Sequence, residues 1–62
     1  MTATISDLRP IGTIARTGDR CPESGSWTVV TQNPVVAAIL AGQIMPRYLG
    51  QTVTWRLIRY GL

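Results

Sequence analysis

The sequence predicts one small domain built mainly of β-strands. Residues 26–31 and 52–60 alternate between two kinds of side chain, with the period of two that is typical of a strand packed on one face. A third stretch, residues 11–16, is dominated by β-branched side chains, which favour strands. A chain of 62 residues forms one domain at most. We therefore expect a flexible tail over residues 1–10 and a single β domain over residues 11–62.

The first half of the chain is expected to hold two strands joined by turns. Gly12 indicates a bulge or a close backbone approach in the first strand, and residues 17–19 are typical of a turn. Pro22 fixes its own φ and Gly25 can adopt a positive φ, so the chain should bend between them. The second strand then begins near Trp27.

Alternation assigns the two faces of the clearest strands. In residues 26–31 one face carries Trp27, Val29 and Thr31, and the other carries Thr28 and Val30. In residues 52–60 the apolar face carries Val53, Trp55 and Leu57, and the mixed face carries Thr54, Arg56, Ile58 and Tyr60. We expect the two tryptophans to pack together in the core, which places Arg56 and Tyr60 together on the outer face.

The segment 34–41 is ambiguous. Local rules favour a two-turn helix, because Asn33 suits the N-cap, Pro34 the first helical position and Gly42 the position after the last turn. The alternative is a buried strand, because the run is short and contains two valines and an isoleucine. With a helix here, the fold class would be α+β.

The composition weighs against catalysis. The chain has no His, the commonest general base, and its single cysteine, Cys21, has no neighbouring base in the sequence to activate it. Cys21 is interpreted as a packing residue, and Asp19 and Glu23 as solvated turn residues. A single Cys without His makes neither an internal disulfide nor a dedicated zinc site, although a regulatory or intermolecular thiol stays open, and no glycine-rich phosphate loop is present. We predict a protein that is not an enzyme, with no catalytic residue, metal, cofactor or small-molecule substrate.

The sequence shows no membrane or export signal. Its longest apolar run, residues 35–41, is far shorter than the roughly 20 residues that span a bilayer. The N-terminus has neither a basic segment nor an apolar one of the kind that directs secretion. We expect no membrane span and a cytoplasmic location, which also suits a lone thiol; export without such a signal stays open.

Association with another chain is expected, because so short a domain buries little surface by itself. As a strand, residues 35–40 would expose either Val36, Ala38 and Leu40 or the alternate set Val35, Ala37 and Ile39. We predict docking to a protein partner or homo-oligomerisation through this segment. The predicted partner-binding residues are Val36, Ala38, Leu40, Arg47, Tyr48, Arg56 and Tyr60.

Two other functions fit the composition. The first is a small nucleic-acid-binding barrel, because the formal net charge is +3 and guanidinium groups and aromatic rings bind phosphates and bases. It would use Arg47, Arg56, Arg59, Tyr48 and Tyr60. Its weakness is that the six arginines are scattered rather than grouped. The second is a carbohydrate- or cell-wall-binding module with an exposed tryptophan.

Turn and core residues over positions 18–57 form one motif. It reads Gly18-x-x-Cys21-Pro22-x-Ser24-Gly25-x-Trp27, then Gly42-x-x-Met45-Pro46-x-x-x-Gly50-x-x-Val53-x-Trp55-x-Leu57. This motif resembles a small domain of bacterial proteins associated with type VI secretion and polymorphic toxin systems. The resemblance implies a compact SH3-like β-fold in which residues 35–40 are a strand running into a turn at Gly42. It implies an adaptor, immunity or secretion-assembly role and carries over no catalytic residue.

Together these observations predict a mostly β fold, either an SH3-like barrel or a twisted antiparallel sheet, with the α+β arrangement as the alternative. The predicted function is a non-catalytic protein–protein interaction module that docks or dimerises through residues 35–40.

Overall fold

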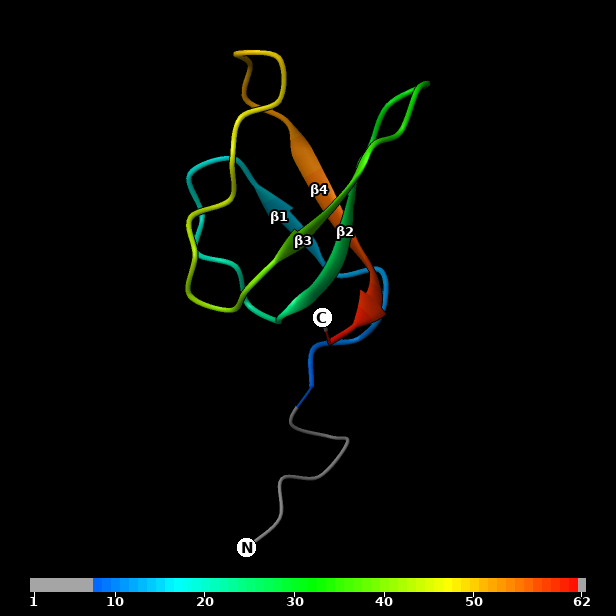
Figure 1. Cartoon of the computed structure of the whole chain (residues 1–62), viewed down its shortest axis with the longest axis vertical. Helices are drawn as coiled ribbons and strands as arrows, with labels where there is room; N and C mark the ends of the chain where they lie inside the picture. The colour runs from blue at the N-terminus through cyan, green and yellow to red at the C-terminus, as the bar shows by residue number, and fades with distance from the viewer. Residues whose placement is uncertain (1–7, 62) are drawn as a thin grey trace, which may run out of the picture.

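The computed structural model describes residues 8–61, which fold into a four-stranded antiparallel sheet. The strands are β1 (Ile14–Arg16), β2 (Gly25–Val29), β3 (Val36–Ile39) and β4 (Thr54–Tyr60). Their order across the sheet is β1-β4-β2-β3, so β4 and β2 are central and β1 and β3 form the edges. The predicted mostly β fold is confirmed, as an open twisted sheet rather than a closed barrel (Figure 1).

The observed strands are shorter than the alternation predicted. β1 begins at Ile14, later than expected, because Gly12 turns the chain with a φ of 97°. β2 ends at Val29, and the connection over residues 30–35 projects away from the sheet (Figure 1). The predicted turn over residues 17–19 is confirmed by a hydrogen bond of 2.9 Å that closes it.

The helix that local rules favoured over residues 34–41 is wrong, because β3 occupies this segment. A helix of two turns is marginal in water, since its nucleation costs more than a few hydrogen bonds return. As a strand, the same segment provides pairing partners for residues 25–28 of β2. Tertiary pairing therefore overrides the local helix signals. Within residues 8–61 the chain forms no helix that is long and apolar enough to cross a membrane.

The start of the folded part lies earlier than expected. The predicted tail falls mostly on residues 1–7, which lie outside the described residues. The last two positions assigned to the tail are bonded to the domain. The backbone amide of Arg9 donates to the carboxylate of Glu23 at 3.2 Å. The carbonyl of Pro10 accepts from both the amide and the hydroxyl of Thr13, at 3.0 and 2.6 Å.

One face of the sheet, the inner face, carries the core. Its buried strand residues, none more than 5% exposed, are Ala15, Trp27, Val29, Ile39, Trp55 and Leu57. The indole Nε1 of Trp27 donates to the carbonyl of Glu23 at 3.0 Å. The indole Nε1 of Trp55 donates to the carbonyl of Pro46, also at 3.0 Å. The prediction that both tryptophans lie in the core is confirmed.

Two connections that pair with each other complete the core. The amide of Cys21 donates to the carbonyl of Gln43, and the amide of Met45 donates to the carbonyl of Asp19, at 2.6 and 2.8 Å. The side chains of Cys21 and Met45 are 3% and 0% exposed. Cys21 is thus a packing residue, as predicted. The burial of Met45 was not predicted, because it lies in a short segment without periodicity.

A bulge in β4 explains why the first residue of β2 is a glycine. Ser26 pairs with Arg59, but the next residue of β2 pairs with Leu57, which leaves Ile58 as an extra residue. A Cβ at Gly25 would overlap the carbonyl oxygen of Arg59. The expectation of a positive φ at Gly25 is wrong, since its φ is not among the positive ones. Glycine is required here by the close approach of two backbones.

Replacing Gly25 by alanine should therefore destabilise the protein by about 3 kcal/mol, because the added methyl group has no space beside the bulge. Urea unfolding followed by tryptophan fluorescence measures the change. The control is Ser26→Ala, which removes only the hydroxyl group of a half-buried side chain next to Gly25 and adds no heavy atom. A loss at Gly25→Ala no larger than that at Ser26→Ala would contradict the close approach.

Candidate functional site

The face of the sheet opposite the core, the outer face, carries exposed side chains on β1, β4 and β3, whereas on β2 Thr28 is only 6% exposed. Pairing places Ile14 beside Arg56, Arg56 beside Thr28, and Thr28 beside Val36. Ile14 and Val36, at the two ends of this row, are 53% and 58% exposed. A second row contains Arg59, Ser26 and Ala38. The outer face therefore carries apolar β-branched side chains near its edges and arginine between them.

The edge strand β3 has backbone groups that face away from the sheet. The amide of Val29 donates to the carbonyl of Val35 at 3.1 Å, which fixes the alternation of the β2–β3 ladder. Residues 35, 37 and 39 therefore direct their N–H and C=O groups toward β2. Val36 and Ala38 direct theirs toward the free edge. Within residues 8–61, these outward N–H and C=O groups of Val36 and Ala38 have no backbone hydrogen-bond partner.

This free edge is bounded at both ends. On one side Pro34 has no N–H to donate. At the other end, Gln43 bonds to both backbone groups of Leu40. The Leu40 amide donates to Gln43 Oε1 at 2.7 Å, and the Leu40 carbonyl accepts from the Gln43 amide at 3.0 Å. The unpaired donors and acceptors are thus those of Val36 and Ala38. We call these two residues with Leu40 the β3 edge surface.

The structure selects one of the two exposed sets that the sequence allowed. Ile39 is 4% exposed and belongs to the core, whereas Val36 is 58% and Leu40 50% exposed. Ala38 is also exposed. Three of the residues predicted to bind a partner therefore lie together in an apolar surface. Their role in binding stays a prediction.

The other predicted partner residues do not form one surface. Arg56 lies on the outer face, two strands from Val36. Tyr60 pairs with Gly25, because the bulge shifts the register by one residue. A shift of one residue reverses the face to which the following side chains belong. The expectation that Arg56 and Tyr60 share a face is therefore wrong.

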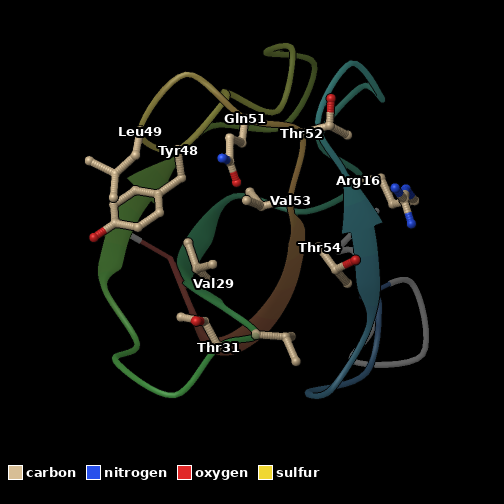
Figure 2. Close-up of a pocket in the computed structure, with 10 residues that line it drawn as sticks. Arg16, Val29, Thr31, Tyr48, Leu49, Gln51, Thr52, Val53 and Thr54 are labelled. Atoms are coloured by element: carbon tan, nitrogen blue, oxygen red, sulfur yellow. The ribbon is translucent and has the colours of Figure 1, made fainter.

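Arg47 and Tyr48 lie in the connection from β3 to β4 and not in β3 itself. Arg47 is exposed, and Tyr48 is half-buried against the core. Tyr48 also forms one wall of a hollow of ≈ 410 Å³. Figure 2 shows Tyr48 and Leu49 on one side of this hollow, Arg16 on the opposite side and Val53 between them.

A tight turn lies beside this hollow. Tyr48 and Gln51 exchange two backbone hydrogen bonds of 3.0 Å around Leu49 and Gly50, whose φ angles are 53° and 75°. Two positive φ values define a type I′ turn, which normally uses Asn, Asp or Gly. Leu49 is 82% exposed, so no burial compensates for its strained backbone. The sequence signal was the glycine alone, since leucine is not a turn residue.

The sequence around the β3 edge surface is uncharged, although the guanidinium of Arg20 donates to the carbonyl of Gly42 at 3.2 Å. Residues 24–46 contain no charged side chain. Asp19 accepts a hydrogen bond from the backbone amide of Arg16 at 2.9 Å, so this carboxylate closes a turn. The predicted lack of a catalytic residue stays a prediction. The carbohydrate-binding hypothesis requires an exposed tryptophan ring, but Trp27 and Trp55 are 0% and 2% exposed.

The comparisons with known proteins identify no relative. No protein-family model matches the chain, and neither curated proteins nor solved structures give a match. The resemblance to a domain associated with type VI secretion therefore stays a prediction based on the motif.

Relief of the strained turn should stabilise the protein. We expect Leu49→Asn to raise the free energy of unfolding by about 1 kcal/mol, because asparagine tolerates the left-handed conformation better than leucine. Urea unfolding measures the gain. Leu49→Ala is the control, since alanine lacks the polar side chain that makes the left-handed conformation easier for asparagine. Equal unfolding free energies for the Asn and Ala variants would show that the turn stores no strain.

Proposed function

We propose that this protein is a non-catalytic protein–protein interaction module that docks or dimerises through the β3 edge surface. The observation that carries the proposal is the open apolar edge itself. Val36 and Ala38 offer backbone donors and acceptors there, beside exposed apolar side chains. Such an edge is a template for pairing with another strand.

The lack of edge protection supports this function. Proteins commonly block edge strands with charged residues, proline, bulges or short length. β1 is blocked in this way, since it has three residues and contains Arg16. β3 has four residues, Val-Ala-Ala-Ile, with no charge, and the register of its pairing with β2 shows no bulge. The protection of one edge and not the other fits a functional β3 edge.

The second candidate, a nucleic-acid-binding surface, has one observation in its favour. Arg16, Arg56 and Arg59 all belong to the outer face, where guanidinium groups are free to meet phosphates. However, Tyr48 and Tyr60 do not share that face, and of these three arginines only Arg16 lines the hollow beside Tyr48. We therefore rank this function below protein binding.

The biological role proposed for this module is based on its sequence motif. The residues of positions 18–57 that resemble the secretion- and toxin-associated domain include Trp27, Trp55 and Leu57, which are buried in the core. We propose on this basis an adaptor, immunity or secretion-assembly role. The apolar β3 edge surface is compatible with each of these roles.

Substitution in the β3 edge surface tests the proposed function. Leu40→Asp should weaken association at least about tenfold, because it places a charge in an apolar contact that must lose water. The matched control is Leu49→Asp, which replaces a more exposed leucine that lies outside β3. Association is measured by sedimentation of the purified protein and by capture of partners from the host on each immobilised form.

The proposal predicts that Leu49→Asp retains the association of the unchanged protein and that Leu40→Asp loses it. Unfolding free energies within about 1 kcal/mol of each other would show that both variants fold. Equal association of Leu40→Asp and Leu49→Asp would contradict the role of the β3 edge surface.

A separate measurement decides between protein and nucleic-acid binding. We expect no binding to a fluorescent oligonucleotide at about 50 mM salt, a concentration at which phosphate contacts are strong. Binding that falls steeply as salt rises, and that is lost in Arg56→Ala, would favour the nucleic-acid function instead.

A further inference from the structure

We infer that the strand that pairs with β3 is β3 of a second copy of this chain, in antiparallel orientation about a two-fold axis at Ala37. The inference rests on the proposed function and names its partner. The pairing would join two four-stranded sheets into one continuous sheet of eight strands.

The outward backbone groups specify the partner as a strand. Val36 and Ala38 each present one N–H and one C=O at the free edge. In an antiparallel pair, two facing residues of this kind exchange both hydrogen bonds. Val36 of one copy facing Ala38 of the second copy, and the reverse, therefore satisfies all four outward groups of each edge. The edge is complementary to itself.

The residues that bound the free edge of β3 allow one register for the pairing of two copies. If Val36 faced itself across the axis, Ala38 would face Pro34, which has no N–H. If Ala38 faced itself, Val36 would face Leu40, whose N–H and C=O are already bonded to Gln43. Both alternatives lose hydrogen bonds. The register with Ala37 at the axis loses none.

The residue at the axis suits the close approach that this register requires. The Ala37 pair would be a non-hydrogen-bonded pair, in which the two Cα atoms lie about 4.5 Å apart. Alanine is small enough for this spacing. On the inner face, Val35 of one copy would face Ile39 of the second copy, and Val35 is 38% exposed in the single chain. Pairing therefore also covers apolar surface beside the core.

The distribution of charge favours a second copy over an unrelated partner. A two-fold axis places each residue near its own copy, so a charge near the axis would meet a like charge. Residues 24–46 carry no charge, although the chain as a whole has a net charge of +3. A strand made for an oppositely charged partner would gain from charge here. The uncharged edge is what self-pairing requires.

Backbone substitution separates pairing through β3 from contact by side chains. The paired edge is shorter than a standard interface, so we expect a dissociation constant on the order of tens of micromolar. Sedimentation from about 10 µM to about 1 mM should show a monomer–dimer equilibrium. Ala38→Pro removes one outward N–H and should abolish the dimer. Ala38→Ser changes the side chain but retains that N–H, and should leave the dissociation constant within about threefold of the unchanged protein.

Cross-linking tests the register. With cysteine in place of Ala37, two copies in the proposed register have Cα atoms within the range that a disulfide spans. Mild oxidation of Ala37→Cys should give a dimer linked through position 37, identified by peptide mass spectrometry. The native Cys21 is 3% exposed and should remain unlinked. Thr31→Cys, in the exposed connection after β2, is the control and should stay largely monomeric.

The outcomes separate this inference from the function on which it rests. A monomer at about 1 mM, or a dimer unaffected by Ala38→Pro, overturns the pairing of two copies. If the protein is monomeric but captures a partner that Leu40→Asp does not, the proposed function holds with another protein as the occupant. If Leu40→Asp changes neither self-association nor capture, both the function and this inference fail.

Discussion

The hydrogen bonds of two buried indole groups determine how the connecting segments cover one face of the sheet. A buried tryptophan N–H needs an acceptor, and both acceptors here are carbonyls of connecting segments rather than of strands. Trp27 bonds to Glu23 and Trp55 bonds to Pro46. These bonds help hold the two connections over the inner face, where Met45 completes the core. The chain therefore builds its core from one face of the sheet and its own loops.

Among residues 8–61, this arrangement leaves the β3 edge and most of the outer face uncovered. A second layer of secondary structure would normally bury such a surface. The edge β1 is protected by its short length and its arginine, whereas β3 is apolar and uncharged. Edge pairing satisfies the outward groups of Val36 and Ala38 without any new element of structure. The open edge and the proposed interaction are thus consequences of the same one-sided core.

The sequence predicted those parts of the fold that depend on alternation. The period of two placed Trp27 and Trp55 in the core correctly, because burial on one face is what that period reports. It could not predict the bulge at Ile58, which depends on how β2 and β4 meet. Local rules also misassigned residues 34–41, where pairing with β2 decides the structure. Of the candidate site, Val36, Ala38 and Leu40 were predicted as an exposed set, but that β3 is an edge follows only from strand order.

Amide hydrogen exchange at Val36 and Ala38, measured by NMR as the protein concentration is raised, tests the central claim most directly. The two amides face the free edge, whereas the amide of Ala37 faces β2. We predict fast exchange at Val36 and Ala38 in dilute protein and slow exchange in concentrated protein, with Ala37 protected throughout. Fast exchange at Val36 and Ala38 at every concentration would contradict the pairing of β3 with a second copy.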